Sequence, residues 1–264
     1  MKVLLCPPTF FRIEYEINPW MNVANDADSE TVLYEYALLK QTLKSAGIEI
    51  MEIQPDKNYP DMVYTANYGF VHDDVFIEAN FKHSQRRGEE IIATSYFKSL
   101  GFQTKQFAKY IFFEGEGDLL RAGNQLYMGF GKRTMFEAKI ELESILATSI
   151  IPLQLTDPYF YHLDTCFAPI SESIAIINPS AFTDYALKIL EQNFSTLLYT
   201  NEQDNAVLGC NIIVHNRNIV VSSGISESLK SGLKQLGYTV LETPMSQYIK
   251  GGGSVKCCCL IVEQ

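Results

Sequence analysis

The stretch Asp61-Met-Val-Tyr-Thr-Ala-Asn-Tyr-Gly-Phe-Val-His-Asp-Asp-Val-Phe-Ile77 holds two apolar, β-rich runs on either side of the turn Val71-His72-Asp73-Asp74. This pattern predicts two strands joined by a tight turn. An amphipathic segment over residues 84–100 follows, and Gly101 occupies the place of a helix C-cap glycine before the chain returns to a short strand. The stretch therefore predicts one ββαβ module.

The same order of elements recurs along the chain. Similar two-strand segments begin near Asp118, His162 and Asn205. The predicted helices cover residues 29–46, 84–100, 134–146, 182–194 and 226–236. Because a repeated supersecondary unit is typical of ring-forming and stacked architectures, we expect an α/β fold of about five ββαβ modules around a pseudo-five-fold axis. A plain mixed α/β sandwich is the alternative.

The composition limits the partners. A formal charge of -10 and the scarcity of Lys/Arg clusters argue against nucleic acid and against anionic membranes. Prolines interrupt the first apolar run at once, so no signal peptide is expected, and no apolar run is long enough to cross a bilayer. No flexible linker divides the sequence, and we expect residues 1–264 to form a single domain.

The six cysteines suit neither a disulfide framework nor the paired spacing of a zinc site. They favour a reducing compartment, and we expect a cytoplasmic protein. Three of them are consecutive, Cys257, Cys258 and Cys259, and follow the glycines Gly251–Gly253. Glycines let the backbone approach a ligand closely, so a strand starting at Cys257 would present this first cysteine at a loop edge. The alternative is that all three are small buried apolar residues.

Two further segments place ionisable groups in unusual surroundings. His162 lies two residues before Asp164, and in an extended segment both side chains would point to one face. The turn at Glu114, Glu116 and Asp118 sets three carboxylates among glycines with apolar flanks. A substrate cation or a histidine partner would explain these carboxylates. A surface pair and a solvated or calcium-binding turn are the respective alternatives.

Two arginines could hold a carboxylate through parallel hydrogen bonds. Arg133 follows a predicted strand, and Arg86 lies at a predicted helix start. Most arginines have no such role, so these two assignments need support from elsewhere in the sequence.

Seven segments in order resemble the guanidino-group-modifying enzymes of the pentein fold, the superfamily of arginine deiminase, dimethylarginine dimethylaminohydrolase and the amidinotransferases. They are Cys6-Pro-Pro8, Ile17-Asn-Pro-Trp-Met21, Pro60-Asp-Met-Val-Tyr-Thr-Ala-Asn67, Glu114-Gly-Glu-Gly-Asp118, Gly131-Lys-Arg-Thr134, His162-Leu-Asp-Thr165 and Gly251-Gly-Gly-Ser-Val-Lys-Cys257. The resemblance covers nearly the whole chain and implies a single catalytic domain folded as a five-bladed α/β propeller. Within this superfamily, the chain resembles a bacterial branch that includes arginine dihydrolases and dimethylargininases.

The resemblance also implies roles for individual residues. Cys257 matches the nucleophile and His162 the general acid/base. Glu114 matches the carboxylate beside the histidine, although Glu116 remains an alternative. Asp164 matches a guanidinium-binding carboxylate, and Arg133 matches a residue that contacts the substrate α-carboxylate, with Arg86 as a helper. The full set of expected substrate-binding residues is Asn67, Asp164, Arg133, Arg86, Glu116 and Asp118. Asn67 is a departure, because arginine deiminases and many dimethylarginine hydrolases place an aspartate there.

These roles imply a cysteine hydrolase that attacks the guanidinium carbon of arginine or a derivative through a covalent thiouronium, without a metal or organic cofactor. The amide of Asn67 can donate a hydrogen bond to a ureido oxygen, whereas an aspartate only accepts, so arginine dihydrolase is the favoured activity. Dimethylargininase is the nearest rival. An amidinotransferase or a non-catalytic binding protein on the same scaffold also stays open. The expected partner is a small molecule, and a homo-oligomer is left open.

Overall fold

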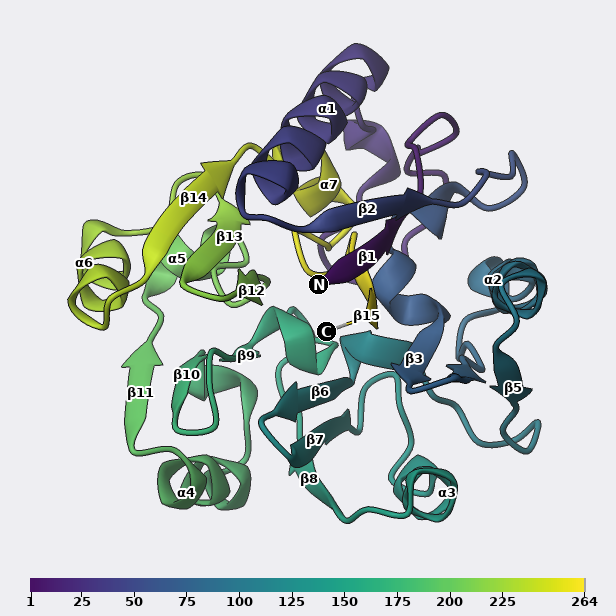
Figure 1. The fold of residues 1–264 in the computed structure, drawn as a ribbon. Helices are drawn as coiled ribbons and strands as arrows, with labels where there is room; N and C mark the ends of the chain where they lie inside the picture. Colours follow the sequence, from purple (N-terminus) through teal and green to yellow (C-terminus); the bar gives the residue numbers. More distant parts are fainter. Residues whose placement is uncertain (264) are drawn as a thin grey trace. The chain divides into compact units, whose positions relative to one another are not determined.

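The computed structural model describes residues 1–263 and contains two compact units. One unit joins Met1–Thr65 with Thr200–Gln264, and the other is the continuous segment Ala66–Tyr199. The helices and strands of both are labelled in Figure 1. We refer to the first unit as the split unit and to the second, Ala66–Tyr199, as the continuous unit.

The split unit contains two three-stranded sheets. Their strand orders are β15-β1-β2 and β12-β13-β14. The bounds are β1 (Lys2–Leu5), β2 (Glu49–Glu52), β15 (Leu260–Glu263), β12 (Ile213–His215), β13 (Asn218–Ser222) and β14 (Thr239–Thr243). In each sheet the central strand pairs antiparallel with one neighbour and parallel with the other.

The continuous unit contains three more three-stranded sheets with the same pattern. The first is β3 (Gly69–His72), β4 (Val75–Glu78) and β5 (Gln103–Lys105). The second is β6 (Leu119–Ala122), β7 (Gln125–Phe130) and β8 (Ile150–Gln154). The third is β9 (Phe167–Pro169), β10 (Ile174–Ile177) and β11 (Thr196–Tyr199).

A helix connects the central strand of each sheet to its parallel neighbour, as a parallel crossover requires. These five helices are α1 (Ser29–Ser45), α2 (Glu89–Ser99), α3 (Ala138–Leu146), α4 (Asp184–Asn193) and α6 (Glu227–Gln235). Their place in the chain confirms the prediction of ββαβ modules. Gly47, Gly101 and Gly237 follow three of them with φ of 81°, 90° and 83°, the left-handed conformation expected of C-cap glycines.

Three local predictions were wrong. The segment 84–100 is interrupted, because Gly88 has φ of 115° and α2 starts only at Glu89. The short helices α5 (Glu202–Ala206) and α7 (Ser246–Lys250) were missed, since five residues carry too little periodicity to reveal a helix. The cysteines 257–259 precede β15 and lie in a turn, where the amide of Cys258 donates to Ser254 O at 3.2 Å.

Each unit has its own apolar core. The core of the split unit includes Val3, Leu39, Leu43, Tyr248 and all three consecutive cysteines. In the continuous unit, Phe113, Leu119, Met128 and Leu142 pack in a second cluster. Within the described residues, no helix is both long and apolar enough to cross a membrane.

Glu35 of α1 is a buried carboxylate that caps α7. Its oxygens accept hydrogen bonds from the backbone amides of Ser246 and Gln247 at 2.8 and 3.0 Å and from the Ser246 hydroxyl at 2.6 Å. A carboxylate at a helix N-terminus also interacts favourably with the helix dipole. The link joins residues more than 200 positions apart in the sequence.

We predict that Glu35→Ala lowers the free energy of unfolding by about 3 kcal/mol, because the first turn of α7 loses a charged acceptor that is itself buried. Urea unfolding measures the change. Gln41→Ala, an exposed change on the same helix, is the control and should alter stability by no more than about 0.5 kcal/mol. Similar losses in both variants would contradict this account of the cap.

Candidate functional site

Glu114 is held by the turn in which it lies. The strand-like bridge between Asn80 and Phe113 fixes the chain just before it, with hydrogen bonds of 2.8 and 3.1 Å. The 3-10 helix Gly115–Gly117 follows. Gly115 has φ of 62°, and a Cβ there would lie 2.5 Å from the carbonyl oxygen of Ala66. Glycine is therefore required for the chain to turn at this point.

Glu114 is fully buried and joins a histidine to an arginine. Its Oε2 lies 2.8 Å from His162 Nε2 and accepts a hydrogen bond from Arg133 Nη1 at 3.0 Å. Its Oε1 accepts the backbone N–H of Lys82 at 3.2 Å. Burial alone would raise the pKa of Glu114, but the charge of Arg133 and the contact with His162 outweigh it and lower that pKa. Glu114 is thus a carboxylate at neutral pH.

This contact orients the imidazole. An ionised carboxylate only accepts hydrogen bonds, so Nε2 of His162 carries the proton on the Glu114 side. The other nitrogen, Nδ1, is then the atom that can take a proton from, or return it to, a reacting group. Of the two carboxylates that the sequence left open, the histidine's hydrogen-bond partner is Glu114.

The backbone after His162 differs from the expected extended segment. The amides of Thr165 and Cys166 donate to the carbonyls of His162 and Leu163 at 3.2 and 3.1 Å, which forms the 3-10 helix Leu163–Thr165. The Thr165 hydroxyl adds a bond of 2.6 Å to the His162 carbonyl. Asp164 therefore lies in a tight turn, and the alternation argument that placed it on the face of His162 was wrong. Both side chains are buried.

Asp118 supports the same turn. Its Oδ1 accepts the backbone N–H of Leu163 at 3.0 Å, and its Oδ2 lies 4.0 Å from His162 Nε2. Burial raises the pKa of Asp118 to about 6, against the opposing effect of the nearby histidine. Asp118 thus lies on the Nε2 side of His162, where it fixes the backbone at Leu163 and adds negative charge near the imidazole.

Asn67 is buried and has a defined amide orientation. Its Oδ1 accepts a hydrogen bond from Nη1 of Arg86 at 2.7 Å, so Nδ2 is the donor end of the amide. Nδ2 donates to the carbonyl of Glu114 at 3.5 Å. Arg86 is fixed in turn by Glu89, to which Nε and Nη2 donate at 3.0 and 2.7 Å. A Cβ at Gly117 would lie 2.4 Å from Asn67 Nδ2 and 3.2 Å from His162 Cγ. The absence of that Cβ lets the amide and the imidazole approach one another.

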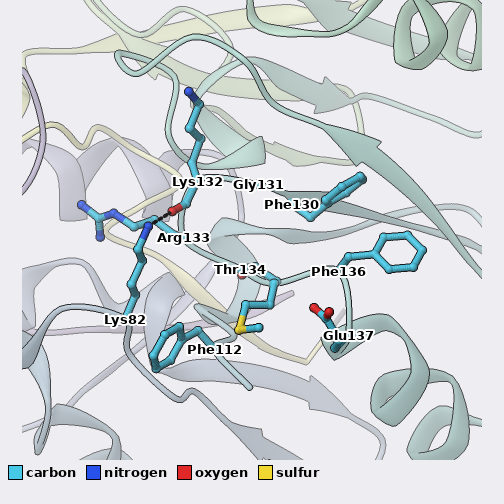
Figure 2. A pocket seen from close by; sticks show the side chains of 10 residues that line it. Lys82, Phe112, Phe130, Gly131, Lys132, Arg133, Thr134, Phe136 and Glu137 are labelled. Atoms are coloured by element: carbon cyan, nitrogen blue, oxygen red, sulfur yellow. Dashed lines mark hydrogen bonds between the residues drawn. The ribbon is translucent and has the colours of Figure 1, made fainter. Parts of the chain in front are cut away.

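A pocket of about 310 Å³ lies beside Arg133 (Figure 2). Phe112, Phe130 and Phe136 line it, and the Nζ of Lys82 bridges to the carbonyl of Lys132 at 2.6 Å. The guanidinium of Arg133 lies 4.5 Å from the ring centre of Tyr161, in a cation–π contact. Arg133 is therefore held by a carboxylate and by an aromatic ring.

Cys257 lies in the split unit, in the turn before β15. Its side chain is buried, and its sulfur accepts a hydrogen bond from Asn211 Nδ2 at 3.2 Å. The glycines before it are required by packing: a Cβ on Gly253 would lie 2.4 Å from Tyr64 Cε1 and 3.0 Å from the Cβ of Cys257. Tyr64 is itself anchored by a hydrogen bond of 2.7 Å from its hydroxyl to the carbonyl of Tyr248.

The continuous unit thus brings together most of the candidate residues within its own fold: Asn67, Arg86, Glu114, Asp118, Arg133 and His162. Glu116 and Asp164 are buried in the adjoining turns. The sequence did not reveal Glu89, Thr134 or Asn211. Thr134, whose Oγ1 accepts the Glu114 amide at 3.1 Å, ends the quoted Gly-Lys-Arg-Thr motif, so attention to its hydroxyl could have identified it.

Metal ligands are not grouped in the part of the chain that the structure describes. Residues 1–263 contain no cluster of three or more His, Cys, Asp or Glu side chains arranged to hold a metal ion. The described residues provide three groups for catalysis. They are the Cys257 thiol with an amide donor, the His162 imidazole oriented by a carboxylate, and the Asn67 amide, whose oxygen is bound by an arginine.

Comparison with known proteins identifies relatives that are named as arginine or dimethylarginine hydrolases. A family model described as N,N dimethylarginine dimethylhydrolase, eukaryotic, matches residues 13–263. A protein from Mycobacterium tuberculosis named N(G),N(G)-dimethylarginine dimethylaminohydrolase is 34% identical over 99% of this chain and 86% of its own length. The bifunctional arginine dihydrolase/ornithine cyclodeaminase ArgZ of Synechocystis sp. is 34% identical over the whole chain. The chain spans only 38% of the length of that relative.

Among solved structures, the N-terminal domain of ArgZ in a cysteine-to-serine mutant bound to substrate superimposes with a TM-score of 0.96. It is 32% identical, and the match covers 100% of this chain and 98% of that one. That protein is described as an arginine dihydrolase from the ornithine-ammonia cycle in cyanobacteria.

The buried pair of Arg133 and Glu114 predicts a pH-dependent stability difference. Because Arg133 helps to lower the pKa of Glu114, the stabilisation is present above the ordinary value of 4.5 and is lost as the pH falls further. We expect Arg133→Leu to reduce the free energy of unfolding by about 3 kcal/mol near pH 7, since it leaves a buried carboxylate without its guanidinium. The deficit should shrink at about pH 4, when Glu114 of the variant becomes protonated.

Urea unfolding at both pH values measures the deficit. Lys132→Leu, at the adjacent and less buried cation, is the control, with an expected change of about 0.5 kcal/mol or less. A deficit for Arg133→Leu that does not depend on pH would show that packing, and not the charge of Glu114, explains the loss.

Proposed function

The chain belongs to the N,N dimethylarginine dimethylhydrolase family, and we propose that it is a cysteine hydrolase acting on the guanidinium carbon of arginine, with arginine dihydrolase as its activity. The observation that carries the proposal is the hydrogen-bonded set of Arg86, Asn67, Glu114 and His162, in which the Asn67 amide joins Arg86 to the Glu114 carbonyl and the Glu114 carboxylate orients the imidazole. The relation to ArgZ, a named arginine dihydrolase, supports the choice of substrate.

In the proposed first cycle, the thiolate of Cys257 adds to the guanidinium carbon and forms a C–S bond. His162 gives a proton to one terminal nitrogen, which leaves as ammonia when its C–N bond breaks. A thiouronium then links Cys257 to the substrate. His162 takes a proton from water, the resulting hydroxide adds to the same carbon, and breaking of the C–S bond returns the thiolate and citrulline.

The second cycle repeats the attack at the ureido carbon of citrulline. Loss of ammonia and hydrolysis of the C–S bond leave a carbamate, which releases carbon dioxide and ornithine. Arginine and two waters are thereby converted to ornithine, carbon dioxide and two ammonia. The ureido group is neutral and has a carbonyl oxygen, which needs a hydrogen-bond donor. Asn67 would supply one, because Arg86 occupies its oxygen, and its NH₂ group has two N–H donors, one of which makes the 3.5 Å contact with the Glu114 carbonyl.

The carboxylates and arginines complete the proposal. Asp164 and Glu116 would bind the guanidinium by charge, while Asp118 supports the histidine turn. Arg133 would bind the substrate carboxylate, as its position in the Gly131-Lys-Arg-Thr134 segment implies, and Arg86 would assist it. Both arginines also hold protein groups, Arg133 the carboxylate of Glu114 and Arg86 the amide oxygen of Asn67.

Dimethylarginine hydrolysis is the second candidate. The Mycobacterium tuberculosis relative with this name covers nearly the same length of chain, which favours it independently of ArgZ. The chemistry at Cys257 and His162 would be the same as in the first cycle, with dimethylamine as the leaving group. Incubation with arginine, dimethylarginine and citrulline, followed by identification of the products, distinguishes the two activities.

We also propose that the five sheets are the blades of a five-bladed α/β propeller made by one catalytic domain. Their shared strand order and helical crossovers support this arrangement. The cytoplasmic location that the cysteine pattern favours stays a prediction.

Cys257→Ser should reduce turnover by about a thousandfold or more, because a serine hydroxyl does not ionise at neutral pH. Cys258→Ser and Cys259→Ser should remain active when folded. Ammonia release measures turnover, and the intact-protein mass during turnover detects the covalent intermediate. An adduct that maps to Cys258, or equal losses in all three variants, would show that Cys257 is not the nucleophile.

Asn67→Asp should stop the reaction largely at citrulline, whereas the wild type should release ornithine and about two ammonia per arginine by the two-cycle scheme. An aspartate would bind the guanidinium cation but repel the carbonyl oxygen of the ureido group. The ratio of ornithine to citrulline measures the effect, with citrulline also supplied as a substrate. Wild-type protein that forms only citrulline would rule out dihydrolysis and leave the cysteine mechanism standing.

A further inference from the structure

Asn211 is fully buried and contacts the turn of Cys257 through its side-chain amide and its main-chain carbonyl. Its Nδ2 donates to the sulfur of Cys257 at 3.2 Å. Its Oδ1 accepts the backbone amides of Cys257 and Ser254 at 3.0 and 3.2 Å. Its main-chain carbonyl accepts the amide of Lys256 at 3.3 Å. One residue, 46 positions before the cysteine in the sequence, thus holds the turn at Ser254, Lys256 and Cys257.

These contacts define the orientation of the Asn211 amide. Two backbone N–H groups point at one end of the side chain, and only the oxygen can accept them. The NH₂ end must therefore face the sulfur. If the Asn211 amide were rotated by half a turn, its NH₂ group would face the backbone N–H groups of Ser254 and Cys257, and both hydrogen bonds would be lost.

The donor at the sulfur has a chemical consequence. A hydrogen bond to the charged form of a group favours that form, so an N–H directed at sulfur favours the thiolate over the thiol. Burial acts in the opposite direction, because it disfavours an isolated charge. The Asn211 amide supplies a compensating interaction at the buried sulfur of Cys257.

We propose that Asn211 is the positioning residue of the nucleophile: its oxygen holds the turn that presents Cys257, and its N–H stabilises the thiolate. This inference rests on the proposed role of Cys257 as nucleophile. It explains why an asparagine suits this position better than an aspartate, which could accept the same two backbone amides but would place a negative charge against the sulfur.

The decisive variant is Asn211→Asp, which keeps the acceptor oxygen and the shape of the side chain but replaces the donor with a charge. The ultraviolet absorbance of thiolate, recorded against pH for each protein with and without the additional Cys257→Ser change, gives the ionisation midpoint of this thiol alone and needs no turnover. We expect Asn211→Asp to raise the midpoint by about one pH unit or more, which is about a tenfold smaller thiolate fraction at a pH below it. The acidic limb of the pH–rate profile with arginine should move in the same direction.

Asn216→Asp is the matched control, because it makes the same chemical change at an exposed turn of the same unit and should leave the midpoint unchanged. In wild-type protein, the side-chain amide resonances of Asn211 should titrate with the midpoint of the thiol, and Cys257→Ser should remove that titration. This second measurement decides the proposal even if Asn211→Asp does not fold.

A folded Asn211→Asp with the wild-type midpoint, or Asn211 resonances that do not respond to the thiol, would overturn the inference. A protein that turns over neither arginine nor dimethylarginine would instead contradict the proposed function. The thiolate titration would then still report whether Asn211 stabilises the charge on Cys257.

Discussion

The burial of the Glu114 carboxylate is the constraint on which the continuous unit depends. An ionised carboxylate loses its hydration when it is buried and must be compensated by partners that donate hydrogen bonds or carry positive charge. Glu114 finds them in His162, Arg133 and the backbone of Lys82, which come from three separate segments of the chain. The same requirement that stabilises the charge thereby fixes the geometry of the imidazole.

Two buried asparagines show a common arrangement, one in each unit. The oxygen of Asn67 is occupied by Arg86, and the oxygen of Asn211 is occupied by two backbone amides. In both side chains the N–H end is thereby selected as the donor. An asparagine has both a donor and an acceptor, and the surrounding partners determine which of them faces the neighbouring group. Replacement by aspartate would preserve the shape and reverse the polarity.

The sequence was sufficient to predict what depends on local patterns. Amphipathic periodicity and C-cap glycines identified the five crossover helices, and the glycine-rich acidic turn at Glu114 stood out because charge rarely lies between apolar runs. Local structure that depends on tertiary contacts was harder to predict from the sequence. The turn of Cys257 is shaped by the distant Asn211, so the prediction of a strand starting at Cys257 was wrong. Gly88 stopped the extension of α2 through a backbone conformation that sequence periodicity does not reveal.

The pairing of β1 with both β2 and β15 has a consequence for synthesis on the ribosome. All strand partners of the continuous unit lie within residues 66–199, so its sheets can form while the rest of the chain is still being made. In contrast, β1 must wait for β15, and this long-range pairing carries a larger loop-closure cost. The turn of Cys257 lacks its exit strand until then. A nascent chain would consequently acquire its ordered imidazole well before its ordered thiol.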